Sequence, residues 1–141
     1  AQSNYPDDWT PGGTGLVSTA PDYMRFALML WNEGEYDGVR ILRPETARQM
    51  RVPQIDGVLG EMGIEGLSFG LGVSIMTDPD AAIMPGHEGD FWWSGAYGTH
   101  LWISPESGIV LVVMQQQEMD RSVDTDAPIV PFLVQAIVLG D

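Results

Sequence analysis

The second half of the chain carries apolar residues at strand spacing, and this pattern limits the possible folds more than any other feature. Ile109–Met114 is an uninterrupted apolar run, typical of a strand covered on both faces. Thr99–Ile103 has the alternating pattern of a strand, and Ser104–Gly108 contains the Pro and Gly of a hairpin turn. A further strand is predicted over residues 69–76, where alternate residues are apolar: Phe69, Leu71, Val73 and Ile75. These segments predict an antiparallel meander.

Two helices are predicted before the meander and one after it. The first begins at Thr19, which can form a capping box with Asp22, and its apolar residues recur at helical spacing. Those residues are Tyr23, Phe26, Ala27 and Leu30. A shorter helix is predicted to begin at Pro44, and residues 54–68 are expected to be a loop. Ile129–Val138 has the pattern of an amphipathic C-terminal helix.

Together these elements predict an α+β fold, in which an antiparallel sheet is flanked by helices. Residues 1–68 would form the helical and loop part, and residues 69–141 the sheet strands and the C-terminal helix. The apolar run Ile109–Met114 needs neighbouring strands on both sides, and the sequence starts at Ala1 without an initiator Met. We therefore expect residues 1–141 to be the C-terminal segment of one longer domain.

Charge and composition exclude several classes of function. The net charge is −14, and all six basic residues are Arg, because the chain contains no Lys. Such acidity argues against nucleic acid and against anionic membranes as partners. The chain has no Cys, which excludes disulfides and Cys-ligated zinc within it. His87, Glu88, Asp90 and His100 lack the spacing of a metal site, so we expect neither a metal nor a cofactor.

The segment Trp92–Gly98 has the composition of a binding wall. Two Trp residues run directly into the small, turn-prone residues of the sequence Ser-Gly-Ala-Tyr-Gly. Neighbouring residues of a strand face opposite sides, so one Trp should pack in the core and the other line a cleft. Glycine beside them would let a backbone approach a ligand closely.

These and other segments resemble the C-terminal half of the serine β-lactamases and penicillin-recognising proteins. The similarity is greatest to the class C-like branch, which includes the family VIII carboxylesterases. It is carried by Gly-Gly-Thr-Gly-Leu-Val-Ser-Thr at residues 12–19, Asp-Tyr-Met-Arg-Phe at 22–26 and Gly-Val-Arg-Ile-Leu-Arg-Pro-Glu-Thr at 38–46. Trp93-Ser94-Gly95 is similar to the family's third motif, usually Lys/His-Thr/Ser-Gly, and the two predicted strands after it are similar to the strands that follow that motif.

The resemblance implies a serine hydrolase whose nucleophile lies outside this chain. The family's nucleophile belongs to a Ser-x-x-Lys motif, and no such motif is possible in a chain without Lys. In the family, that motif and the Tyr motif of the general base both lie upstream of the matched region. The rest of the protein is therefore an expected partner of this segment, with a small ester or amide as substrate.

The resemblance also assigns roles to individual residues of the third motif. The backbone N–H of Ala96 would be an oxyanion-hole donor, which acyl transfer requires. Trp93, Ser94, Gly95 and Tyr97 would contact substrate, although Tyr97 could equally be a packing residue. Trp93 stands where a cation usually binds the β-lactam carboxylate, so the sequence favours neutral esters. The alternatives left open are β-lactamase or D-alanyl peptidase activity, and a non-catalytic binding module.

The resemblance finally predicts the order of the strands. The strand containing Trp93 would be an edge beside the active site, Thr99–Ile103 would be next, and Ile109–Met114 third. Residues 109–116 would then present unpaired backbone groups on their outer side, which are costly to leave open. We expect this edge to pair with the rest of the protein or, by self-association, with a second copy of the chain.

Overall fold

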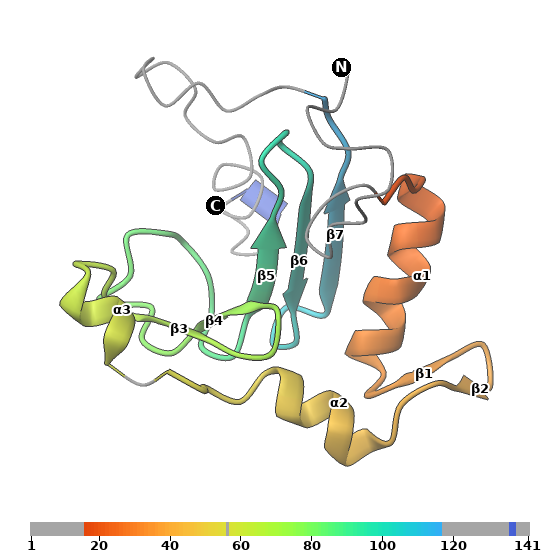
Figure 1. The fold of residues 1–141 in the computed structure, drawn as a ribbon, viewed down its shortest axis with the longest axis horizontal. Helices are drawn as coiled ribbons and strands as arrows, with labels where there is room; N and C mark the ends of the chain where they lie inside the picture. Colours follow the sequence, from red (N-terminus) through yellow and green to blue (C-terminus); the bar gives the residue numbers. More distant parts are fainter. Residues whose placement is uncertain (1–15, 56, 117–135, 138–141) are drawn as a thin grey trace, which may run out of the picture.

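Helices and two antiparallel sheets make up the computed structural model, which describes residues 16–55, 57–116 and 136–137 (Figure 1). The helices are α1 (Ala20–Trp31), α2 (Pro44–Met50) and α3 (Val58–Glu61). A small sheet pairs β1 (Glu35–Tyr36) with β2 (Val39–Arg40). The larger sheet contains β3 (Leu67–Phe69), β4 (Ser74–Met76), β5 (Phe91–Ser94), β6 (His100–Ser104) and β7 (Ile109–Val113), in that order. The α+β prediction is therefore confirmed.

Helix α1 begins as its sequence predicts. The side chain of Thr19 accepts a hydrogen bond from the backbone N–H of Asp22 at 3.3 Å, and Pro21 lies in the first turn. At its end, Gly34 adopts a φ of +96° and its N–H donates to the carbonyl of Met29. A Cβ at Gly34 would lie 2.4 Å from the carbonyl oxygen of Leu42, so this position needs glycine on two counts.

The prediction that Phe26 belongs to the buried face of α1 is wrong. Phe26 is 40% exposed, whereas Ala27, Met29 and Leu30 are buried. The sheet meets the helix along the side that carries Met24, Ala27 and Trp31, so the buried stripe is rotated away from Phe26. Its ring instead contacts the ring of Tyr23, with centroids 5.6 Å apart.

The single strand predicted over residues 69–76 is also wrong, because this segment folds back on itself. β3 ends at Phe69 and β4 begins at Ser74, and these two residues pair in register. The N–H of Gly70 donates to the carbonyl of Val73, and Gly72 adopts a φ of +85°. The two glycines occupy alternate positions of a strand-like pattern, but their backbone freedom allows a tight turn instead. The predicted loop over 54–68 likewise contains α3 and the start of β3.

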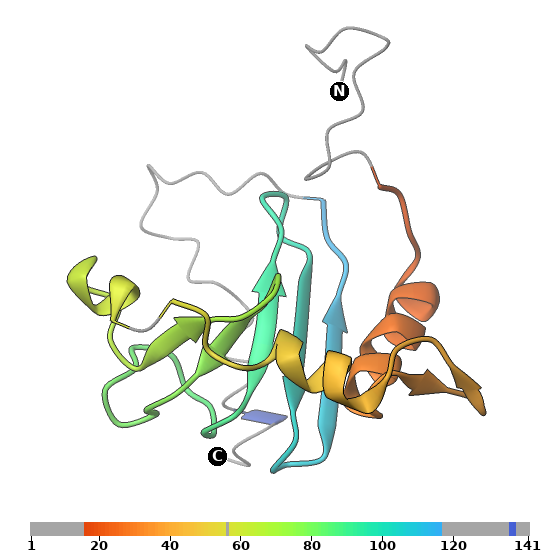
Figure 2. The same ribbon diagram turned by 60° about the horizontal axis from the view of Figure 1, so that its bottom comes forward.

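The larger sheet packs apolar side chains on both faces. Helix α1 lies beside β7 (Figure 2). One face packs against α1, and its buried residues include Ile75, Phe91, Leu101 and Ile103. On the other face, Trp92 and Trp102 stack with ring centroids 4.3 Å apart. Beneath this stack the buried carboxylate of Asp90 accepts hydrogen bonds from Trp102 Nε1 at 3.1 Å and from the N–H of His87 at 3.0 Å. Asp90 thus fixes the loop that leads into β5.

The predicted order of β5, β6 and β7 is confirmed, but β5 is not an edge strand. It also pairs with β4, through Ser74 with Trp92 and Ile75 with Phe91. β7 is the last strand of the described sheet, and there it pairs with β6 alone. Whether another chain segment covers its outer side stays a prediction.

Most of the predicted C-terminal helix, Ile129–Val138, lies outside the described residues; only Ala136 and Ile137 are described. In the part of the chain that is described, no helix has the length and apolar character needed to cross a membrane.

Candidate functional site

The second half of β5 has an open backbone edge. β4 pairs with β5 only as far as Trp92, so it does not reach Trp93 or Ser94. The N–H of Gly95 donates to Thr99 across the hairpin, which places the backbone groups of odd-numbered residues on the β6 side. The even-numbered residues therefore face the β4 side, where Asp90 accepts a bond from Met76. By this alternation the backbone groups of Ser94 face the open side.

A tight turn follows β5 and contains the remaining candidate residues. The N–H of Gly98 donates to the carbonyl of Gly95 at 3.0 Å, so Ala96 and Tyr97 are the two central residues of the turn. Both are exposed, Tyr97 to 50%. Among the described residues, no acceptor pairs with the Ala96 N–H. The sequence interpretation put Ala96 on the strand wall, whereas the strand ends at Ser94 and Ala96 lies just beyond it.

Trp93 is half-exposed beside this open edge. It is 49% exposed, in contrast to Trp92, which is 5% exposed in the core. Its ring meets the ring of Phe69, from the end of β3, edge to face with centroids 5.1 Å apart. The sequence reasoning treated Phe69 only as a strand residue. No signal in the sequence pointed to this contact, because it depends on the fold-back between β3 and β4.

Ser94, which follows Trp93 in β5, forms a hydrogen-bonded pair with His100 on the face of the sheet opposite the Trp93 side chain. They are direct cross-strand partners on β5 and β6, and Ser94 Oγ lies 2.7 Å from His100 Nδ1. His100 is buried, and this burial lowers the pKa of its imidazole. The ring is therefore neutral at pH 7, with one nitrogen as donor and the other as acceptor. The sequence reasoning placed His100 on a strand but did not connect it with Ser94.

The close approach at Gly95 comes from within the chain. A Cβ at this position would lie 2.3 Å from Thr99 Oγ1, so the facing side chain already fills the space. At Gly98, with φ of +82°, a Cβ would lie 2.2 Å from Gln115 Nε2. The hairpin is therefore packed against side chains of this chain, Thr99 within it and Gln115 after β7, in addition to any approach of substrate to Gly95.

We expect Gly95→Ala to lower turnover by the full-length protein several-fold, because the added methyl group overpacks the hairpin. Overpacking of this kind typically lowers the free energy of unfolding by about 1–3 kcal/mol. The double variant Gly95→Ala/Thr99→Ala removes the clashing hydroxyl and should recover most of the loss. Thr99→Ala alone is the matched control. Steady-state kinetics and melting temperature of the three variants measure this. A double variant as impaired as Gly95→Ala would mean that substrate, not Thr99, needs the space.

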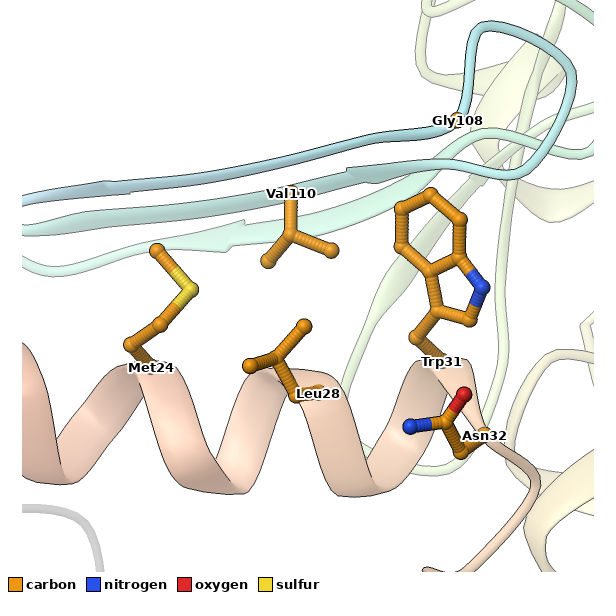
Figure 3. A pocket seen from close by; sticks show the side chains of 6 residues that line it. All are labelled: Met24, Leu28, Trp31, Asn32, Gly108 and Val110. Carbon is orange, nitrogen blue, oxygen red and sulfur yellow. The ribbon is translucent and has the colours of Figure 1, made fainter. Parts of the chain in front are cut away.

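A separate groove lies between α1 and β7 (Figure 3). It is lined by Met24, Leu28, Trp31, Asn32, Gly108 and Val110. None of the third-motif residues lines it, so it is distinct from the open edge of β5.

Comparison with known proteins decides the family. The profile of the family described as Beta-lactamase matches residues 1–134. The chain belongs to the beta-lactamase family. The resemblance predicted from the sequence is thus confirmed at the level of the family.

Relatives of this beta-lactamase family chain are considerably longer. The chain is 39% identical over 133 residues to Protein Rv1367c of Mycobacterium tuberculosis. The matched region covers 88% of this chain but 33% of that protein. The chain thus spans about a third of the relative's length.

Solved structures of the same fold include enzymes. EstCE1, described as a hydrolase with promiscuous acyltransferase activity, superposes with a TM-score of 0.60 and 29% identity, covering 72% of this chain and 25% of that one. A Bacteroides dorei protein assigned to the beta-lactamases by inference gives a TM-score of 0.61 at 23% identity. The superposition covers 84% of this chain and 39% of that one. The second likeness shows the fold alone, whereas the first also bears on the chemistry considered below.

Proposed function

We propose that this chain is the C-terminal part of a serine carboxylesterase of the beta-lactamase family, acting on neutral esters through an acyl-enzyme. The nucleophilic Ser would be supplied by the rest of the protein, because no Ser-x-x-Lys occurs here. The likeness to EstCE1, described as a hydrolase with promiscuous acyltransferase activity, supports hydrolysis through acyl transfer. Assignment to the class C-like branch, and to the family VIII carboxylesterases within it, is part of this proposal.

The observation that carries the proposal is the apolar wall formed by Trp93 and Phe69. Trp93 stands at the position where the family usually has a cation, and it offers an exposed indole instead. Within the described part of the chain, the cation found against β5 is Arg51, whose guanidinium lies 5.5 Å from the centre of the Phe91 ring. Its charge is paired with Glu33 at 3.1 Å. This wall therefore suits an uncharged acyl or alkoxy group better than a carboxylate.

The open edge supplies the polar part of the proposed site. The Ala96 N–H would donate to the oxyanion of the tetrahedral intermediate, with a second donor from the rest of the protein. Ser94, Gly95 and Tyr97 would contact the substrate around it. The net charge of −14 also disfavours anionic substrates.

β-Lactamase or D-alanyl peptidase activity is the main alternative, since these enzymes would use the same edge and turn. A non-catalytic binding module of the same fold is the other. Ester preference separates the first alternative from the proposal, and the presence of any turnover separates the second.

Turnover of p-nitrophenyl acetate and nitrocefin by the full-length protein tests the proposal. We expect kcat/KM for the ester to exceed that for the β-lactam by at least about tenfold, an energy difference of about 1.4 kcal/mol. A preference for nitrocefin would move β-lactamase activity to first place. Turnover of neither, by a protein shown to be folded, would favour the binding module.

A further inference from the structure

A buried imidazole holds the hydroxyl of the candidate site. Ser94 Oγ and His100 Nδ1 are 2.7 Å apart, a short hydrogen bond between two register partners of β5 and β6. His100 is 8% exposed, and the register partner on its other side, in β7, is Val113. Neither flanking partner is charged, and the His100 pKa is lowered by desolvation alone. The imidazole is thus packed in place and neutral, with Ser94 as its polar partner.

A fixed partner changes what a serine hydroxyl can do. A free hydroxyl rotates and can donate or accept in several directions, whereas one bound to a buried ring is restricted to the remaining lone pairs or hydrogen. Ser94 is partly buried, and its side chain lies on the face of the sheet that carries His100, opposite the face of the half-exposed Trp93. The backbone groups of Ser94 face the open edge of β5 beside the exposed turn at Ala96, so its hydroxyl suits a polar contact with a substrate that lies along this edge.

We propose that His100 is a positioning residue that orients the Ser94 hydroxyl toward the substrate. This rests on the proposed ester hydrolysis, and it extends it by naming a residue that acts through another without touching the substrate. Ser94 then contributes an oriented contact rather than a nucleophile, because acylation uses the Ser of the upstream motif.

A double-mutant cycle in the full-length protein tests the proposal. Ser94→Ala and His100→Leu should each lower kcat/KM for p-nitrophenyl acetate by about threefold to tenfold, as expected for one hydrogen bond, mainly through a higher KM. The double variant should be no worse than either single variant, because His100 acts only through Ser94. His100→Asn should restore most of the activity, since its amide can bond Ser94 from nearly the position of Nδ1.

His87 offers a matched control. Its Nδ1 lies 3.2 Å from Ser107 Oγ, a similar pair in loops away from the third-motif residues. His87→Asn should leave ester turnover unchanged. Melting temperatures of all variants separate a loss of positioning from a loss of folding.

The nitrogen resonances of the imidazole provide a readout that does not need activity. In the full-length protein, the His100 Nδ1 signal, assigned by its loss in His100→Asn, should move in Ser94→Ala and stay in place in Ser107→Ala. A wild-type protein that hydrolyses no ester would reject the proposed function, while an unmoved signal would reject the Ser94–His100 pair itself. Additive losses in the double variant, or no rescue by Asn, would overturn the positioning role.

Discussion

Replacing Trp93 by Lys in the full-length protein should raise the preference for a β-lactam over a neutral ester by about tenfold to a hundredfold. A cation placed within about 4 Å of a carboxylate in a partly shielded site can contribute roughly 1–3 kcal/mol. Trp93 is half-exposed, and among the described residues its ring contact is with Phe69, so the fold should tolerate the change. The measurement is the ratio of kcat/KM for nitrocefin to that for p-nitrophenyl acetate.

Trp93→Gln is the matched control for this substitution. Gln resembles Lys in being flexible and unbranched but carries no charge, so it separates the effect of the cation from the loss of the indole. Gln should lower ester turnover without raising nitrocefin turnover. If Lys and Gln gave the same ratio, Trp93 would not lie beside the substrate carboxylate.

The 141-residue chain by itself should turn over esters at least about a thousandfold more slowly than the full-length protein. An oxyanion hole without its nucleophile retains at best about 10³–10⁴-fold catalysis over water. The chain has no Lys and hence no Ser-x-x-Lys motif. Stopped-flow assays with p-nitrophenyl acetate measure this, on material shown to be folded by circular dichroism. A burst of product equal to the chain concentration would contradict the expectation.

Local signals predicted the elements whose boundaries depend on a few neighbouring residues. The cap at Thr19 and the glycine stop at Gly34 define α1, and the apolar run beginning at Ile109 forms β7. The error at Phe26 has a different origin. Periodicity shows that a helix is amphipathic, but the neighbouring sheet decides which of two adjacent stripes is covered.

The parts of the candidate site that could not be predicted depend on register and on reversal of the chain. Gly70 and Gly72 fit both a strand and a turn, so the fold-back that brings Phe69 to Trp93 was not predicted. The pairing of Ser94 with His100 requires the turn at residues 95–99 to set the register. A hydrogen bond between residues on two strands follows only once that register is known.

The central claim is that this chain completes a serine hydrolase whose nucleophile lies elsewhere in the protein. Labelling the full-length protein with a fluorophosphonate probe, followed by peptide mapping, tests it most directly. The account predicts one stoichiometric adduct on a Ser of a Ser-x-x-Lys motif outside these 141 residues. An adduct on Ser94, or on any other Ser within the chain, would contradict it.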